Sequence, residues 1–187
     1  MKQHFFVFDV SLCFGCQGCV AACVNANQIK GDQHWRKVFK LPPHNGANDT
    51  IYLSMSCNHC EEPPCVKACP ADALRIRDED GIVVLEIDAC LGCRYCQMAC
   101  PYDVIVWMED KKTVGKCNMC CDRLDRGEEP ACVATCFSGA LQLITTDSID
   151  QRDDLENEMI GFEHHKDVKP RIRFVKKFKS VLQTESE

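Results

Sequence analysis

The chain has 187 residues, 17 of which are cysteine, and 28 acidic residues exceed 22 basic ones, giving a formal net charge of −6. This length suits one or two small domains. The apolar fraction of 45% includes the cysteines, and without them it falls to roughly 36%, which is low for a core held by hydrophobic burial alone. The negative charge disfavours nucleic acid as the main partner.

Membrane insertion and secretion are also disfavoured. The longest uninterrupted apolar run without a cysteine covers residues 104–108, far short of the roughly 20 residues that a spanning helix needs. Only four apolar residues stand between the N-terminal Lys and Asp9, which is no signal-peptide core, and the first 30 residues contain no Arg pair. We expect a cytoplasmic protein without a direct membrane span, or one that is exported or membrane-associated only as part of a complex.

The predicted elements are short. The segment HFFVFDV predicts a strand ahead of the first cysteines. Residues 24–56 form a cysteine-free connection in which LPPHNGAND is turn-rich and IYLSMS alternates like a strand. Further on, ALRIR and IVVLEID flank DEDG and predict a hairpin that turns near Asp80 and Gly81. VIVWM and TVGKC predict a second hairpin.

A short internal repeat follows three of the cysteines. Apolar residues recur four, five and seven positions after Cys69, Cys100 and Cys136. This spacing predicts a short strand after a helical turn at each place.

The C-terminal part is strongly charged. Residues 147–163 hold seven acids and one Arg, and Leu155 with Met159 predicts a thin helical stripe. Residues 166–179 hold seven Lys or Arg. Two interpretations stay open: a solvated tail, or a docking arm with which an electron carrier grips its partner. A membrane-surface role for KKFK is a weaker alternative.

The cysteines carry the chemistry, and they fall into four clumps. The first and third clumps read C-x2-C-x2-C-x3-C, the second reads C-x2-C-x4-C-x3-C, and the fourth reads C-x2-C-x11-C-x3-C. In chain order their members are Cys13, Cys16, Cys19 and Cys23; Cys57, Cys60, Cys65 and Cys69; Cys90, Cys93, Cys96 and Cys100; and Cys117, Cys120, Cys132 and Cys136. The remaining cysteine is Cys121.

Iron–sulfur clusters explain these spacings better than disulfides or zinc. A disulfide framework does not fit an odd cysteine count without a secretion signal. Zinc commonly takes its four ligands as two pairs, whereas three clumps here place three thiols within seven to nine residues. Three thiolates on one tight loop suit three corners of a 4Fe–4S cluster, with a fourth arriving from elsewhere. No C-x2-C is followed by His, and no C-x3-C by a Cys three positions on, which excludes c-type haem attachment and the radical adenosylmethionine loop.

The spacing also predicts which cysteines share a cluster. In the two-cluster bacterial ferredoxin run, the fourth cysteine, which precedes Pro, ligates the other cluster. Pro70 and Pro101 follow Cys69 and Cys100 in this way, while Val24 and Phe137 stand at the equivalent outer positions. The predicted ligand sets are Cys57, Cys60, Cys65 and Cys100; Cys90, Cys93, Cys96 and Cys69; Cys13, Cys16, Cys19 and Cys136; and Cys117, Cys120, Cys132 and Cys23.

Some residues near the clumps call for an interpretation. His59 lies inside a clump, but Cys57 and Cys60 already satisfy the spacing, so we expect a structural role for it. Cys121 is expected to be a bystander. Three cations lie within or beside clumps and would either raise a cluster's potential or be ordinary surface charge. They are Lys67, Arg94 and Lys116.

Three stretches make the sequence resemble a known family. They are SCNHCEEPPCVKACP, DACLGCRYCQMACPY, and KCNMCCDR with PACVATC. The chain resembles the four-cluster electron-transfer subunits of the dimethyl-sulfoxide-reductase family of molybdenum or tungsten oxidoreductases over nearly all of residues 3–145. Some relatives carry Trp where this chain has Cys96, and with it a 3Fe–4S cluster; the Cys here implies four 4Fe–4S clusters.

The predicted fold is α+β, with two ferredoxin-like units of the bacterial two-cluster type, one inserted in the other. Residues 1–47 and 108–145 would form the outer unit, residues 48–107 the inner unit, and residues 146–187 a charged C-terminal tail. By the resemblance, the partner is a large molybdenum or tungsten pterin catalytic subunit, often with a membrane anchor.

The predicted function is a non-catalytic wire that relays electrons through four clusters between that subunit and a redox partner. No G-x-G-x-x-G or Ser–His–Asp pattern indicates a catalytic site in this chain. The alternatives are a wire for a hydrogenase or formate-dehydrogenase complex, and a structural or regulatory module braced by clusters.

Overall fold

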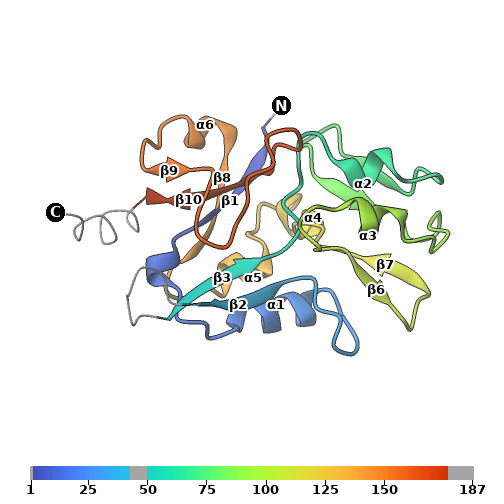
Figure 1. Cartoon of the computed structure of the whole chain (residues 1–187), viewed down its shortest axis with the longest axis horizontal. Helices are drawn as coiled ribbons and strands as arrows, with labels where there is room; N and C mark the ends of the chain where they lie inside the picture. Colours follow the sequence, from blue (N-terminus) through green and yellow to red (C-terminus); the bar gives the residue numbers. More distant parts are fainter. Residues whose placement is uncertain (1, 43–49, 177–187) are drawn as a thin grey trace.

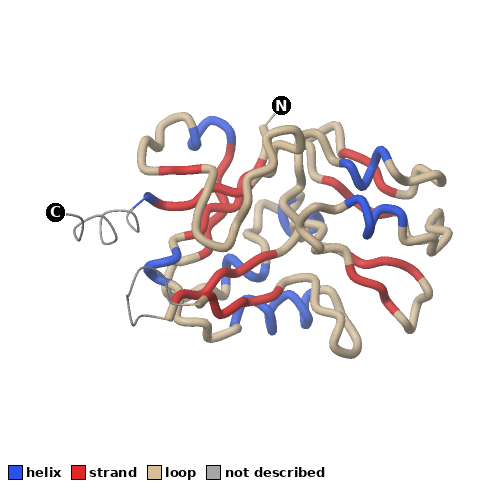
Figure 2. The backbone as a smooth tube through the Cα atoms, viewed as in Figure 1, coloured by secondary structure: helices blue, strands red, loops and turns tan. Residues whose placement is uncertain are grey.

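The computed structural model describes residues 2–42 and 50–176. It has the α+β character that the sequence predicts, with a four-stranded sheet, three separate hairpins and several short helices (Figure 1). Loops connect these elements along most of the chain (Figure 2). Within the described residues, no helix has the length and apolar character needed to cross a membrane.

The four-stranded sheet joins the two ends of the described chain. Its order is β8 (Leu141–Thr145), β1 (His4–Phe8), β10 (Ile172–Val175) and β9 (Leu155–Glu156). Strand β1 pairs antiparallel with β8 and parallel with β10. Because β1 is covered on both faces, the continuous apolar run that predicted it is buried from Phe5 to Phe8.

The C-terminal part differs from the predicted tail. Strands β9 and β10 complete the sheet, and Leu155 belongs to β9 rather than to a helix. Met159 forms an isolated bridge with Phe162. The sequence concealed this because β10 alternates buried apolar residues with Arg173, whose guanidinium covers the Phe5 ring at 4.9 Å. The end of the basic run, including KKFK after its first lysine, lies outside the described residues.

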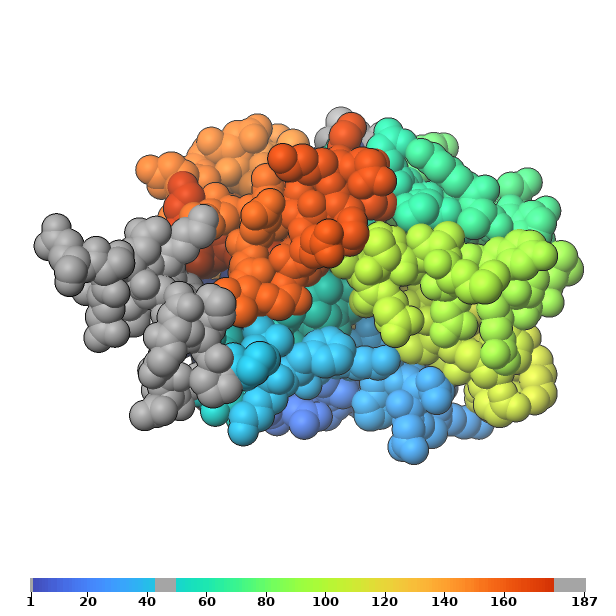
Figure 3. Space-filling view, in the orientation of Figure 1, coloured from blue at the N-terminus to red at the C-terminus, as the bar shows by residue number. Residues whose placement is uncertain are grey.

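The segment between β9 and β10 crosses the molecule to the second cysteine clump. The backbone N–H of Glu61 donates to the Lys169 carbonyl at 3.0 Å, and the N–H of Arg171 donates to the Asn58 carbonyl at 2.9 Å. In the space-filling view, the orange surface of this segment covers the middle of the face between the ends of the molecule (Figure 3). It therefore ties the sheet to a cysteine loop.

The remaining strands form three antiparallel pairs. The two predicted hairpins are confirmed: β4 (Leu74–Ile76) pairs with β5 (Val83–Leu85), and β6 (Val106–Met108) pairs with β7 (Thr113–Gly115). The predicted strand in IYLSMS is β3 (Ile51–Met55), and it pairs with β2 (Lys37–Leu41), which the sequence did not indicate. Most of the turn-rich LPPHNGAND segment lies outside the described residues.

The helices are short, and all of them except the last lie next to cysteines in the chain. They are η1 (Val10–Leu12), α1 (Gly18–Ala26), α2 (Pro64–Lys67), α3 (Tyr95–Ala99), α4 (Cys121–Leu124), α5 (Ala131–Ala134) and α6 (Thr146–Ile149). Helix α1 packs against α5, and α2 packs against α3. The first clump thus meets the fourth, and the second meets the third.

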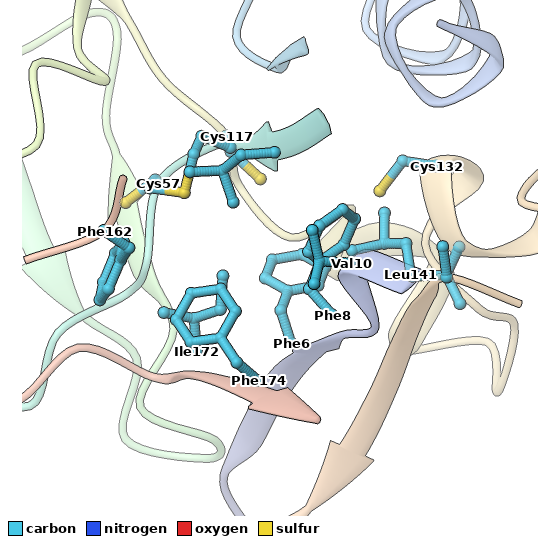
Figure 4. Close-up of a cluster of buried hydrophobic side chains, with 14 of the residues drawn as sticks. Phe6, Phe8, Val10, Cys57, Cys117, Cys132, Leu141, Phe162, Ile172 and Phe174 are labelled. Carbon is cyan, nitrogen blue, oxygen red and sulfur yellow. The ribbon is translucent and has the colours of Figure 1, made fainter. Parts of the chain in front are cut away.

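Cysteines form part of the buried core. The largest apolar cluster combines β1 side chains such as Phe6 and Phe8 with Phe174 and with Cys57, Cys117 and Cys132 (Figure 4). A second cluster contains Cys65 and Cys96. The low fraction of apolar residues other than cysteine therefore agrees with the core, in which thiols occupy places that aliphatic side chains usually fill.

Candidate metal centres

The four cysteine loops share one backbone feature. In every clump, the residue just before the second cysteine has a positive φ, between 46° and 71°. These residues are Gly15, His59, Gly92 and Met119. Left-handed backbone suits glycine but costs a residue with a side chain of order 1 kcal/mol. His59 and Met119 adopt it nonetheless, so the surrounding structure imposes the same turn on four unrelated sequences.

This turn directs backbone N–H groups at sulfur. The N–H of His59 lies 3.5 Å from Cys57 Sγ, and the N–H of Met119 lies 3.3 Å from Cys117 Sγ. The N–H of Gly15 likewise opposes the raised pKa of Cys13. Each donor is two residues after the first cysteine of its clump. Such hydrogen bonds stabilise a thiolate, which is the form that binds iron.

The middle clumps bring their cysteines into two four-thiol groups. We call Cys57, Cys60, Cys65 and Cys100 group 3, and these four line one hollow. We call Cys69, Cys90, Cys93 and Cys96 group 4, and these four line another. Each group therefore contains three thiols from one clump and the last thiol of the neighbouring clump, as the ferredoxin spacing predicts.

The outer clumps show the same exchange through their electrostatics. We call Cys13, Cys16, Cys19 and Cys136 group 1, and Cys23, Cys117, Cys120 and Cys132 group 2. Burial raises the pKa of the Cys13 thiol, and three neighbouring thiols raise it further: Cys19, Cys136 and Cys16. Burial also raises the pKa of Cys23, with the other three members of group 2 adding to the effect.

The thiols of the inner groups repel each other's charge in the same way. Burial, followed by the other three members of group 3, raises the pKa of Cys60 to about 12. Burial raises the pKa of Cys96 to about 11, and the other members of group 4 contribute. A thiol with a raised pKa stays protonated until a cation neutralises it, so binding of iron at Cys60 and Cys96 releases protons.

Cys69 is the exception, and its surroundings explain why. Its slight burial favours the neutral thiol, but the backbone N–H groups of Leu74, Ala71 and Ala73 all donate to its sulfur and together lower its pKa. These donors follow the cysteine and lie on both sides of the αL residue Asp72. Asp103 and Gly139 also have positive φ three residues after Cys100 and Cys136, and the N–H of Leu141 lies 3.3 Å from Cys136 Sγ.

The donor set fits cubane clusters. Each group offers four thiols, the ligand number and type of a 4Fe–4S cluster. Among residues 2–42 and 50–176, no three His, Cys, Asp or Glu side chains are arranged to hold a single metal ion. Thiolates on four separate irons stand farther apart than thiolates on one ion.

The neighbouring residues fall into structural and electrostatic roles. His59 is fully buried, its Nδ1 accepts the Val83 N–H at 3.1 Å, and burial lowers its pKa well below the usual value. It is therefore a neutral structural residue. Cys121 belongs to none of the four groups and lies 3.9 Å from an Asp122 carboxylate oxygen.

The three cations near the clumps differ in burial. Lys67 is two-thirds exposed and pairs with Glu62 at 2.9 Å, as surface charge does. Arg94 stacks over the Trp107 ring at 3.8 Å. Lys116 is buried and donates to the backbone carbonyls of Val83 and Cys117. From the sequence alone, an effect on a cluster's potential and ordinary surface charge were equally favoured for all three.

A fourth cation, Arg36, was not identified from the sequence. It is almost completely buried and lies near thiols of groups 1 and 2. It stands in the cysteine-free connection, 13 residues beyond the nearest cysteine in the chain. The spacing of clump residues therefore gave no signal for it.

Comparison with known proteins agrees with these centres. The profile of the 4Fe-4S dicluster domain matches residues 48–146. The sequence is 38% identical over 156 residues to one chain of the anaerobic dimethyl sulfoxide reductase of Escherichia coli (strain K12), covering 79% of this chain and 76% of the relative.

Two further relatives are named as parts of other reductases. A polysulfide reductase chain of Wolinella succinogenes is 42% identical over 144 residues, which is 75% of each protein. A tetrathionate reductase subunit of Salmonella typhimurium (strain LT2) is 38% identical over 141 residues, which is 74% of this chain and 56% of the relative. With its 4Fe–4S clusters and no catalytic role of its own, the chain therefore belongs to the iron–sulfur electron-transfer subunits of the dimethyl-sulfoxide-reductase family of molybdenum oxidoreductases.

Proposed function

We propose that groups 1 to 4 each hold one 4Fe–4S cluster and that the four clusters form a single path for electrons. The observation that carries this proposal is the repeated site design. Each group takes three thiols from one loop and one from another, and every loop has the same left-handed turn before its second cysteine. The bound clusters supply one-electron redox chemistry, while the chain supplies their ligands, spacing and electrostatic surroundings.

Contacts between groups support the order 1–2–3–4. The Cys19 thiol of group 1 acts on the pKa of Cys132 in group 2. Cys117 of group 2 acts on the pKa of Cys57 in group 3. Groups 3 and 4 share an apolar cluster that contains Cys65 and Cys96. Each group therefore has its next neighbour in the order at close range.

The same contacts support two nested ferredoxin-like units. Helices α1 and α5 belong to the outer clumps, and their packing encloses groups 1 and 2. Helices α2 and α3 belong to the inner clumps and pack together in the same way. We assign residues 1–47 and 108–145 to the outer unit and residues 48–107 to the inner unit, with β9 and β10 added to the outer unit's sheet.

Apolar side chains surround both ends of this path and suit protein partners. Leu12, Phe14 and Phe137 are exposed beside group 1, and the two phenylalanine rings lie 5.2 Å apart. Leu91, Tyr95 and Met98 are exposed beside group 4. Exposed apolar patches of this kind favour docking. We assign one end to a large molybdenum or tungsten pterin subunit and the other to the redox partner, such as a membrane-anchor subunit.

Metal analysis of anaerobically purified protein tests the cluster assignment. We expect about 16 iron and 16 sulfide per chain, with four of each in every cluster. Replacing Cys69 should alter the same electron paramagnetic resonance (EPR) signal as replacing Cys90, because both belong to group 4. Cys121→Ser is the matched control and should keep all four signals. Zinc without sulfide, or a Cys69→Ser spectrum that matches Cys57→Ser, would contradict the proposal.

A further inference from the structure

Arg36 is a buried cation that has no carboxylate partner among the described residues. Only 2% of its surface is exposed, and no Asp or Glu of the described part of the chain lies within ion-pair distance of it. Its two terminal nitrogens donate to Ser54 Oγ at 3.0 Å and Ser56 Oγ at 2.8 Å, and its guanidinium lies 4.9 Å from the centre of the Phe6 ring. A buried charge needs compensation, and neutral hydroxyls supply little of it.

The compensating charge comes from cysteine sulfur. Burial disfavours the charged form of Arg36, yet its pKa is raised because nearby cysteines, whose sulfurs are thiolates when they ligate iron, favour the cation. These cysteines are, in order of effect, Cys132, Cys117, Cys19 and Cys23. They belong to group 2 except for Cys19, which belongs to group 1. Arg36 therefore lies near cysteines of both of the first two groups of the proposed path.

A hydrogen-bond relay leads from Arg36 to group 1. Ser54 Oγ lies 3.4 Å from Cys19 Sγ while it accepts a hydrogen bond from Arg36. A guanidinium can only donate, and a ligating thiolate can only accept. The hydroxyl hydrogen of Ser54 is then left to point at Cys19. The serine thus transmits the positive charge of Arg36 to one sulfur ligand as a polarised O–H group.

We propose that Arg36 is a positioning residue that sets the reduction potentials of the clusters in groups 1 and 2. This inference rests on the proposed cluster assignment. Each cluster gains one negative charge when it accepts an electron, so a fixed cation beside it favours the reduced form and raises its potential. One charge near two clusters raises the potentials of both, and Ser54 further raises the potential of the group 1 cluster alone.

EPR-monitored redox titration of the purified complex tests the inference. Arg36→Gln should lower the reduction potentials of the group 1 and group 2 clusters by about 59 mV. For a one-electron couple, this corresponds to about a tenfold change in the equilibrium constant of reduction. Arg36→Lys keeps the charge and should restore most of the shift. Ser54→Ala should lower the potential of group 1 and leave group 2 unchanged. Cys16→Ser and Cys120→Ser identify the two signals.

Arg171→Gln is the matched control for loss of a buried arginine. Arg171 is 3% exposed, but it lies by Gly81 and Cys60, away from groups 1 and 2. We expect the potentials of groups 1 and 2 to stay unchanged in this variant. If Arg36→Gln does not fold, Arg36→Lys and Ser54→Ala decide the question by the pattern given above.

Two failures are distinguishable. Fewer than four clusters in the unaltered complex would overturn the proposed function. Four clusters whose potentials do not respond to Arg36→Gln would overturn only the role of Arg36. With an unfolded Arg36→Gln, equal potentials in Ser54→Ala and the unaltered protein would also overturn it.

Discussion

The two ends of the cysteine path differ from its middle. Groups 1 and 4 each contain an exposed cysteine, Cys16 and Cys93, whereas groups 2 and 3 each have three buried cysteines. The ends are rimmed by exposed apolar side chains, and the middle is packed among the core residues of the sheet. Accessibility suits clusters that exchange electrons with other proteins, and burial suits clusters that only pass them on.

Buried cations divide the path differently, because they set group 4 apart from the other three groups. Arg36 and Lys116 are almost inaccessible and act on thiols of groups 1, 2 and 3. Arg94, beside group 4, is exposed and stacks on Trp107. Because water screens an exposed charge and leaves a buried one largely unscreened, the potentials of the clusters in groups 1, 2 and 3 should depend more strongly on fixed protein charge than the potential of the group 4 cluster.

The largest expected effect comes from interrupting the path, and it should not depend on where the path is cut. Cys13→Ser at one end, Cys96→Ser at the other and Cys132→Ser in the middle should all abolish turnover with the physiological electron partner. Turnover with a small dye that reaches the catalytic metal directly should survive. Cys121→Ser should keep both activities, since Cys121 belongs to no group. Full physiological turnover in a variant that lacks one cluster would contradict a single path.

Iron loss should separate the ends from the middle. When a chelator is added under mild oxidation, we expect the signals of groups 1 and 4 to decay first, because Cys16 and Cys93 expose their clusters. About half of the iron should leave in this phase. The EPR spectrum and the iron content are followed together over time. Equal decay of all four signals would show that cysteine exposure does not control cluster stability here.

The sequence predicted some features of the fold and of the site and missed others. Cysteine spacing predicted the hollows lined by groups 3 and 4, apolar runs with turn residues between them predicted β1 and the hairpins β4–β5 and β6–β7, and alternation predicted β3. The strands and hairpins depend on residues close together in the chain, and the two hollows follow a known ligand spacing. The ligand assignment stays a prediction until the iron is measured.

The features that were missed depend on distant contacts. Strand β10 looks like part of a charged tail until β1 supplies a partner for it. The left-handed residues His59 and Met119 carry no sequence mark, since glycine occupies only two of the four equivalent positions. Arg36 gains its role because the chain folds it beneath two cysteine loops that lie far apart in sequence.

A buried cation in the middle should matter for stability. Lys116→Met would leave the carbonyls of Val83 and Cys117 without this donor, which should lower the free energy of unfolding by about 2 kcal/mol. Lys67→Met is the control, because Lys67 is two-thirds exposed and solvent screens its ion pair with Glu62, so this variant should unfold like the unaltered protein. Anaerobic urea unfolding measures both. Equal midpoints for the two variants would contradict a structural role for Lys116.

The smallest expected effect concerns the exposed cation beside group 4. Arg94→Gln removes a charge next to Cys93 and the stacking on Trp107 at 3.8 Å, so the potential of the group 4 cluster should fall. The fall should be less than the about tenfold change expected for a buried charge, because solvent screens Arg94. Raising the salt concentration should shrink the difference further.

Arg152→Gln, which removes an arginine paired with Asp154 beside β9, should leave the group 4 potential unchanged. A group 4 potential that is the same in Arg94→Gln and the unaltered protein at low salt would show that Arg94 serves only to hold Trp107. A shift as large as that of Arg36→Gln would instead mean that solvent screens the charge of Arg94 no better than it screens the buried charge of Arg36.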